Sequence, residues 1–294
     1  MSIEDFKEYV LLRRDAFEEK YNLIKLDRKP LRQKHLCNNL KYLDDMSQIM
    51  IRTLNNHPVP LRDKLLTVLV YRLVGDKNLV RRYANSQGVF TIQGVELLAK
   101  RLDKKIGYPV VRYNTPVFKT GTHGLTSGEY LLAVTCSFLD NMPRDMYRGY
   151  KMSEIVKSLR EWDKVYGIST FFAYELASDF SYINELNIKI DYVSRTPNPI
   201  HRIYEQVTGE KYTQKGYKAF TEEIMDWYTE QEFNDNKERL ILPHDVTHML
   251  YGYNNYLKKR STGVQLWRKP ARGKKQIKGI VIARSMYDYY TKKV

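Results

Sequence analysis

Apolar residues recur every three to four positions along most of this sequence, and this helical period constrains the fold more than any other feature. Ten segments carry it, at residues 3–21, 36–54, 61–74, 92–102, 125–141, 152–164, 170–182, 200–208, 216–230 and 245–259. Strand patterns are few, the best being YPVVRY at 108–113 and GIVIA at 279–283. The sequence therefore predicts a mostly α protein, with one helical domain over residues 1–262 and a basic C-terminal arm over 263–294.

The chain is strongly basic. Its 294 residues include 49 Lys and Arg against 34 Asp and Glu, which gives a formal net charge of +15. Such a surplus favours a polyanionic partner, either nucleic acid or an anionic membrane surface. The longest apolar runs, such as LLTVLVYRLV at 65–74, are too short to span a bilayer. We therefore expect a nucleic-acid partner and no membrane partner.

The two cysteines and the N-terminal segment bear on location. Cys37 and Cys136 form no CxxC motif, so neither a cysteine-rich zinc site nor a disulfide scaffold is expected. The first residues are acidic and amphipathic, unlike a secretory signal peptide. We expect reduced thiols and a cytoplasmic protein.

Two predicted helices flank a tight turn in SLREWDKVYGISTFFAYELASDF, at 158–180. A glycine at position 167 lets the backbone approach a ligand closely, and Ser169 or Thr170 can cap the second helix. The N–H groups of that second helix can bind a phosphate oxygen without reading sequence. This is the logic of a helix-hairpin-helix, here at about 152–182. An ordinary turn between two helices is the alternative, because Ser169 stands where a second glycine is usual.

Three stretches together resemble one family. WDKVYGISTFFAYELASDFSY at 162–182 is similar to its GIGxFLAYxIxxDLxY segment. HLCNNLKYLDDMSQIM at 35–50 is similar to FCNVxRExDxVT, with Lys41 replacing arginine and Ser47 replacing threonine. HDVTHMLYGYNNYLKKRSTG at 244–263 is similar to DxEHxLCEFDKYxR. The blocks, in this order over residues 1–265, resemble phage α-glutamyl/putrescinyl-thymine pyrophosphorylases, also called amino acid:DNA transferases. Relatives of these enzymes include the helical domain of phage 5-hydroxymethyluridine DNA kinases.

This resemblance implies a fold like that of the helix-hairpin-helix DNA glycosylases. It also implies an activity on double-stranded DNA that contains modified thymine. An amine or amino acid would displace phosphate or pyrophosphate from a 5-(phospho)methyl group, giving a hypermodified base. In the third block, acids of the family pattern are replaced by Thr247, Gly252 and Asn254, and its cysteine by Tyr251. These departures imply that the protein takes a different amine or is a divergent, even inactive, member of the family.

The chemistry requires an extruded base, donors for the leaving phosphate and an acceptor for the amine's proton. The first block offers Asn38, Lys41 and Asp44, spaced to lie on one helix face. On the functional interpretation Lys41 contacts the phosphate, Asn38 a base edge, and Asp44 orients one of them. A solvated helix face with a salt bridge is the alternative.

Further acids and one arginine are candidates. Arg72 lies in an otherwise apolar helix, so it must be paired, with Asp44 or Asp76, or face a cavity and the phosphate. Asp179 ends the second hairpin helix. Asp191 follows the hairpin at the distance of the catalytic aspartate of hairpin-type glycosylases, and either aspartate can instead be structural. Phe171 lies where lyase-type glycosylases carry their lysine, which argues against a Schiff-base mechanism.

Asp245 and His248 of the third block are the remaining catalytic candidates. The spacing of His244 and His248 mimics a zinc-binding HExxH helix, but Pro243 precedes it and no third ligand is evident. We predict no metal and no cofactor. A structural histidine bonded to a carboxylate is the alternative for His248.

The predicted DNA-binding residues are the hairpin group and a set of cations beyond it: Lys164, Gly167, Ser169, Thr170, Arg195, Arg202, Lys258 and Lys259. The Gly/Thr-rich stretch at 115–128 is either a lid over the flipped base or a surface loop. It is not a Walker A loop, and the sequence holds none, so kinase activity is not expected. A DNA glycosylase using Asp191 and a non-catalytic DNA-binding protein are the alternatives to the transferase.

Overall fold

The computed structural model describes residues 1–20, 29–30, 39–75, 77–103, 125–162, 170–191, 198–231, 241–261 and 267–268. These residues are mainly helical, which confirms the predicted class. The elements in chain order are α1 (Ile3–Lys20), β1 (Lys29–Pro30), η1 (Lys41–Leu43), α2 (Asp45–Asn55), α3 (Leu61–Val74), α4 (Lys77–Tyr83), α5 (Ile92–Asp103), α6 (Ser127–Asp140), α7 (Met152–Trp162), α8 (Thr170–Phe180), η4 (Asn184–Leu186), α9 (Asn198–Thr208), α10 (Gln214–Thr229), α11 (Pro243–Ser261) and β2 (Trp267–Arg268).

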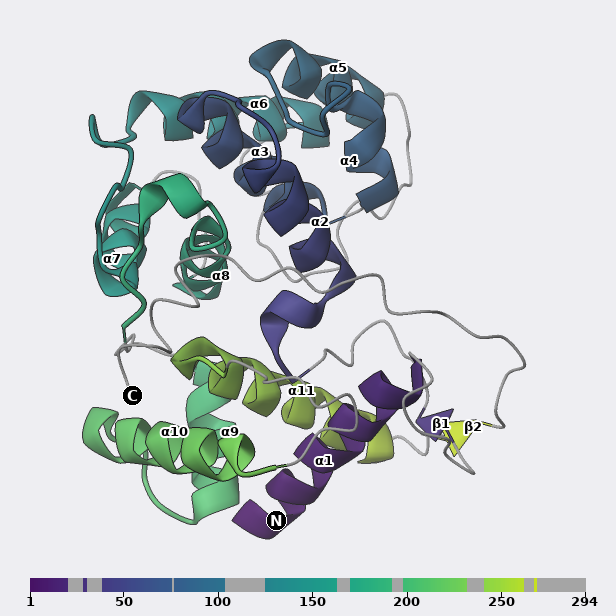
Figure 1. Cartoon of the computed structure of the whole chain (residues 1–294), viewed down its shortest axis with the longest axis vertical. Helices are drawn as coiled ribbons and strands as arrows, with labels where there is room; N and C mark the ends of the chain where they lie inside the picture. Colours follow the sequence, from purple (N-terminus) through teal and green to yellow (C-terminus); the bar gives the residue numbers. More distant parts are fainter. Residues whose placement is uncertain are drawn as a thin grey trace. The chain divides into compact units, whose positions relative to one another are not determined.

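The chain forms two compact units (Figure 1). Unit 1 combines Met1–Gln48 with Tyr192–Val281, and unit 2 combines Ile49–Asp191 with Ile282–Val294. The boundary between them falls within α2. The predicted end of the helical domain at residue 262 and almost all of the predicted arm lie outside the described residues, so this division stays a prediction.

In unit 1, α11 packs against α1, α9 and α10. Aromatic side chains fill the contacts: Phe6 of α1 meets Tyr253 edge to face, with ring centroids 5.5 Å apart, and Phe220 of α10 joins them. At the crossing of α1 and α11, Gly252 allows close approach, because a Cβ there would lie 2.6 Å from the Tyr9 hydroxyl. The strands β1 and β2 pair antiparallel, with Lys29 opposite Arg268.

In unit 2, α3 is the central helix. It begins and ends as predicted, and nearly all of its side chains are buried, because apolar residues surround its whole circumference. It ends at Gly75, whose φ of +65° is the left-handed conformation typical of a residue that terminates a helix. α3 packs against α4, α6 and α8, while α5 pairs with α6 and α7 with α8.

The prediction of one helix over 36–54 is wrong in its described part. The chain forms the short 3-10 turn η1, becomes extended at Asp44 (ψ 142°), and only then begins α2. Asn38 lies outside the described residues. Lys41 and Asp44 therefore do not share a helix face, and the predicted i, i+3 arrangement is not formed.

Other predicted elements differ less. The nine remaining helical segments agree with observed helices to within a few residues, whereas the short helices α4 and η4 were not predicted. The strands expected at 108–113 and 279–283, and the hairpin turn at 163–169, lie outside the described residues. Within the described part, no helix combines the length and apolar character that crossing a membrane requires.

The contact between α5 and α6 depends on Gly128. Its N–H donates to Asp103 Oδ1 at 2.7 Å, and a Cβ at this position would lie 2.3 Å from the Ala99 carbonyl oxygen. We expect Gly128→Ala to lower the free energy of unfolding by about 1–3 kcal/mol, because backbone must move. Ser127→Ala, one residue away, should change it by less than about 0.5 kcal/mol. Equal effects in urea unfolding would contradict this account.

Candidate functional site

The start of α11 is fixed by its own third residue. Leu242 precedes the helix, Pro243 is its first residue, and the Leu242 N–H donates to Asp245 Oδ2 at 2.9 Å. Proline is favoured at the first helical position, and a carboxylate in the first turn accepts one of the N–H groups that the helix leaves unpaired. The sequence PHD therefore begins the helix and points Asp245 back along it.

The other oxygen of Asp245 joins two distant parts of the chain. Asp245 Oδ1 accepts the backbone N–H of Lys41 at 2.7 Å, across 204 residues of sequence. Both residues are buried, Asp245 completely and Lys41 to 3% exposure. This bond holds η1 against α11 and explains why the region cannot continue as a regular helix: the Lys41 N–H is used in a tertiary contact.

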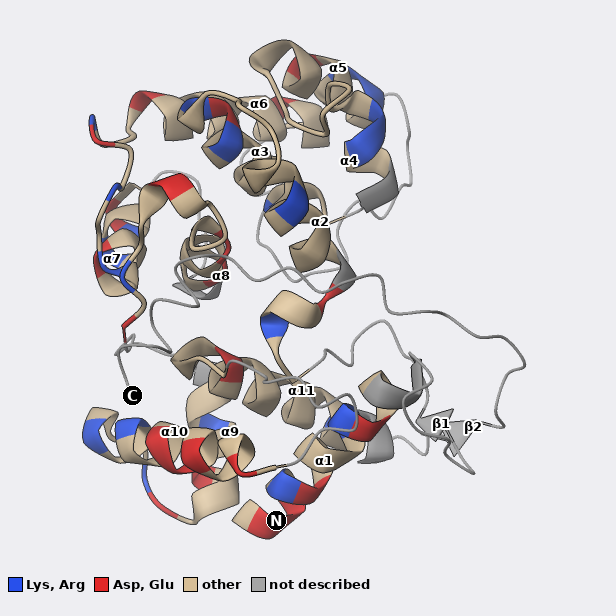
Figure 2. Ribbon diagram, in the orientation of Figure 1, with Lys and Arg blue, Asp and Glu red and all other residues tan. Residues whose placement is uncertain are grey.

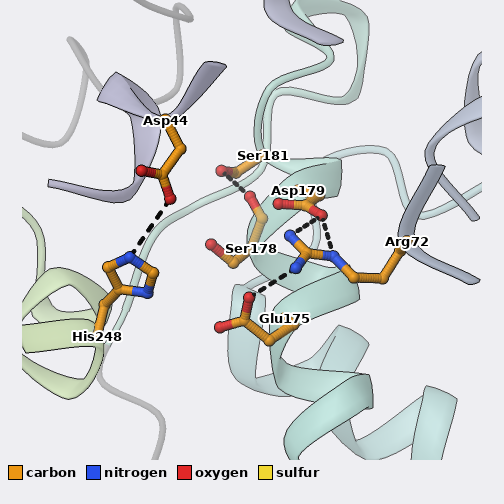
Figure 3. Close-up of polar contacts among 7 residues, drawn as sticks. All are labelled: Asp44, Arg72, Glu175, Ser178, Asp179, Ser181 and His248. Atoms are coloured by element: carbon orange, nitrogen blue, oxygen red, sulfur yellow. Dashed lines mark hydrogen bonds and ion pairs between the residues drawn. The ribbon is translucent and has the colours of Figure 1, made fainter. Parts of the chain in front are cut away.

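Asp44 follows η1 directly and lies opposite His248, one turn after Asp245 on α11 (Figure 3). His248 Nε2 and Asp44 Oδ2 are 3.5 Å apart. The Asp44 side chain is 31% exposed and that of His248 9%. A carboxylate beside an imidazole, partly open to solvent, is an arrangement that can accept a proton from a substrate.

The electrostatics of Asp245 reflect its burial. Removal from water raises the pKa of the Asp245 carboxyl from 3.8 to about 7. The N–H groups of Lys41 and Leu242 and the charges of His248 and Lys41 lower the pKa by less than burial raises it. Both oxygens of Asp245 accept backbone N–H groups, one from Leu242 and one from Lys41. Asp245 therefore fixes η1, and with it Asp44, against α11, where His248 lies.

At two positions where the third block departs from the pattern that it resembles, Thr247 and Gly252, the residues present take part in core packing. The Thr247 hydroxyl lies 2.9 Å from the Tyr217 hydroxyl in the core, and burial raises the Tyr217 pKa. Gly252 faces the Tyr9 hydroxyl. At position 252 a Cβ would lie 2.6 Å from the Tyr9 hydroxyl, and at 247 the threonine hydroxyl takes part in a core hydrogen bond, so both positions serve the helix contacts of unit 1.

A second polar cluster lies within unit 2 and joins α3 to α8 (Figure 3). Arg72 Nε donates to Asp179 Oδ2 at 2.6 Å, and Arg72 Nη1 donates to Glu175 Oε2 at 2.9 Å. Asp179 is fully buried, and Glu175 nearly so. Arg72 thus pairs with these two acids of α8 within unit 2; Asp76, one of the partners considered from the sequence, lies outside the described residues.

Sequence reasoning missed Glu175. It precedes Asp179 by four residues, so the two carboxylates share one face of α8. An acid pair at this spacing in an otherwise apolar helix was the signal that could have identified the partners of Arg72.

Asp191 holds the beginning of α7. Its Oδ1 accepts the Ser153 N–H at 2.9 Å, and its Oδ2 accepts the Ser153 hydroxyl at 2.5 Å. A carboxylate at a helix N-terminus is stabilised by the unpaired N–H groups there. Both oxygens of Asp191 are therefore engaged in supporting the helix.

Residues 2–260 match the family model described as the 5-hmdU DNA kinase, helical domain. The chain belongs to this family. No curated protein and no solved structure matches it.

The predicted DNA-binding residues lie partly within the described part of the chain. Arg202 is exposed on α9 and Lys258 is exposed on α11. Thr170 begins α8 and Lys259 lies in α11, with side chains outside the described part. Four further residues also lie outside it: Lys164, Gly167, Ser169 and Arg195.

The histidine pair of the third block was weighed as a metal site. His244 and His248 lie one turn apart on α11, and His244 is buried. Among the described residues of the helical domain, no group of three His, Cys, Asp or Glu side chains is placed to hold a metal ion.

The Arg72 cluster yields a stability prediction. Arg72→Leu leaves the buried Asp179 without its guanidinium, and we expect the free energy of unfolding to fall by about 3–5 kcal/mol. Arg62→Leu is the matched control, because Arg62 is exposed on the same helix. Denaturant unfolding of both variants provides the measurement. A loss after Arg62→Leu as large as that after Arg72→Leu would refute the assignment.

Asp245 yields a pH prediction. A folded-state pKa raised to about 7 means that the native state keeps this proton where the unfolded state has lost it. The stabilisation is complete below about pH 4 and is lost as pH rises to about 7, with a slope of at most about 1.4 kcal/mol per pH unit. Asp245→Asn, which mimics the protonated carboxyl, should remove this slope. Wild-type and variant curves that run parallel from pH 4 to 7 would contradict it.

Proposed function

We propose that this chain modifies DNA by transferring an amine or amino acid to a 5-(phospho)methyl-deoxyuridine base, with release of phosphate or pyrophosphate. Membership of the 5-hmdU DNA kinase helical-domain family supports a role in thymine modification in DNA. The observation that carries the proposal is the Asp44–His248 pair, which the fold assembles from the first and third blocks.

The proposed step balances in atoms and charge. The amine nitrogen attacks the methylene carbon at position 5 of the base, forming a C–N bond. The C–O bond to phosphate breaks, and the phosphate leaves with the electron pair. The nitrogen loses one proton, which the Asp44–His248 pair accepts. Since an ammonium ion cannot attack, a proton acceptor is the group that this reaction most needs from the protein.

The remaining candidates take supporting roles. Asp245 and Lys41 position η1, and through it Asp44, against α11. Arg72, Glu175 and Asp179 fix α3 to α8 in unit 2. Asn38 remains a proposed contact to the flipped base, and the hairpin at 163–169 a proposed contact to the DNA backbone.

The proposal favours transfer over phosphorylation. Kinases that use a P-loop cradle the nucleotide phosphates with a GxxxxGK[ST] segment, and this sequence contains none. The family name describes a kinase, but the residues assembled around Asp44 and His248 include a proton acceptor and no nucleotide-binding loop. The proposed partners are double-stranded DNA with a modified thymine and a small amine co-substrate.

The test incubates the protein with phosphomethyluracil-containing duplex DNA and a mixture of amino acids and polyamines, followed by mass analysis of the nucleosides. A base of increased mass is the expected product. His248→Gln and Asp44→Asn should each slow its formation by about 100-fold or more, because proton transfer is lost. His57→Gln, a histidine substitution in unit 2, should leave the rate unchanged.

Other outcomes have definite meanings. Abasic sites in place of a new base would identify a glycosylase and overturn the proposal. Retained DNA binding with neither product would identify a non-catalytic DNA-binding protein. Full activity in both the Asp44 and the His248 variant would refute the role given to the pair.

A further inference from the structure

In the described part of the chain, backbone strain concentrates in the loop that enters α7 and in the segment bonded to it. Among the described residues, the non-glycine residues with positive φ are Met146 (53°), Tyr147 (65°) and Asn187 (47°). The first two lie in the loop that enters α7, and Asn187 lies in the segment hydrogen-bonded to that loop. Such conformations cost about 1–3 kcal/mol each and persist where the surrounding structure enforces them, commonly at functional sites.

Hydrogen bonds join the two strained segments into one surface. The Gly149 N–H donates to the Leu186 carbonyl at 2.7 Å, and the Lys189 N–H donates to the Tyr150 carbonyl at 2.9 Å. A parallel backbone bridge then sets Lys151 beside Lys189. Below the loop, the Tyr147 ring stacks on Phe180 of α8, with centroids 5.8 Å apart. The loop backbone is therefore held at several points.

Five cations gather on this scaffold, and we call them the α7 basic surface: Arg148, Lys151, Lys157, Arg160 and Lys189. Arg148, Lys151, Lys157 and Lys189 are exposed, and Arg160 is half-buried. None of the five forms an ion pair with any described residue. Figure 2 shows blue segments on α7, on the loop that enters it and on the segment beside it.

Lys157 and Arg160 extend this surface along the helix. They follow Ser153 at i+4 and i+7, so the three residues form one stripe of α7. Ser153 binds Asp191, two residues after Lys189. The stripe therefore begins where the second segment meets the helix, and the cations of loop and helix form one continuous region.

Among the described residues, none of the neighbouring acids forms an ion pair with these cations. Asp145 accepts the Tyr147 N–H at 3.2 Å, Glu154 accepts the Lys151 N–H at 2.7 Å, and Asp191 accepts Ser153. These carboxylates fix the loop and the helix start. Glu161 follows Lys157 by one turn without an ion pair among the described residues. The cations thus remain available to an external anion.

We propose that the α7 basic surface binds the phosphate backbone of duplex DNA. The surface starts at the loop that enters α7 and extends along the helix to Arg160 in its last turn, whereas the predicted hairpin turn at 163–169 lies outside the described residues. Cations on a backbone fixed by hydrogen bonds lose less conformational freedom on binding than cations on a free loop. Repeated phosphates along a strand are the anion that several separated cations fit, because phosphate contacts position a protein without reading sequence. The inference rests on the proposed function for its choice of DNA as partner.

The test is the salt dependence of binding to an unmodified duplex. The triple variant Arg148→Gln, Lys151→Gln, Lys189→Gln should bind roughly tenfold or more weakly at moderate salt, with the slope of log K against log [salt] reduced by about 2–3. The matched control is Arg81→Gln, Arg82→Gln, Lys100→Gln, which removes the same charge from exposed positions on α4 and α5 of the same unit. The control should keep the wild-type slope.

Three results would overturn the inference. They are an unchanged slope in the loop variant, an equal reduction in the control, and no wild-type binding even at low salt. An unchanged slope with wild-type folding would instead point to an acidic protein as partner. Circular dichroism melts of both variants establish that folding is intact. The duplex is unmodified, so the binding test is valid even if the protein transfers no amine. If the protein does transfer an amine but the loop variant binds DNA with the wild-type salt slope, only the inference about the α7 basic surface is overturned.

Discussion

A single buried carboxylate organises unit 1. Asp245 accepts one N–H from the residue before α11 and another from Lys41, more than 200 positions earlier. Through these two bonds, the helix start, the 3-10 turn and the side chain of Asp44 become parts of one arrangement. A buried carboxylate whose two oxygens both accept hydrogen bonds fixes the positions of its donors. A buried carboxylate without donors lowers the free energy of unfolding. The partly exposed Asp44–His248 pair can form because the fully buried Asp245 carboxylate fixes η1 against α11.

In unit 2, buried charged side chains fix the position of one helix against another. Arg72 interrupts an apolar helix and would be very unfavourable alone, but two acids of α8 surround its guanidinium. The result ties α3 to α8 at a defined rotation. Buried polar groups therefore fix helix positions in both units, while the aromatic and aliphatic core supplies most of the stabilisation.

Much of this could be predicted from the sequence. Helical periodicity located nine of the ten predicted helical segments, and the bounds of α3 were predicted to the residue because apolar residues dominate it. The break at Asp44 could not be predicted, because local propensity in HLCNNLKYLDDMSQIM favours a helix and a distant carboxylate overrides it. α4 was not predicted because its seven residues make only about two turns, too few for a helical repeat of apolar residues to be recognised.

In the candidate site, too, the sequence predicted local features but not the long-range contacts. The residue types Lys41, Asp44, Asp245 and His248 were identified one by one, from motif positions. What brings them together is a contact across 204 residues, for which the sequence has no local signal. Asp191 was chosen by its distance from the hairpin, yet its carboxylate supports the start of α7, where a polar side chain was needed for a local reason.

The close contact at Gly252 also has an evolutionary consequence. Since a Cβ at position 252 would lie 2.6 Å from the Tyr9 hydroxyl, an acid there requires the tyrosine to shift or to be replaced by a smaller residue. The order of substitutions matters, and the two sites are epistatic.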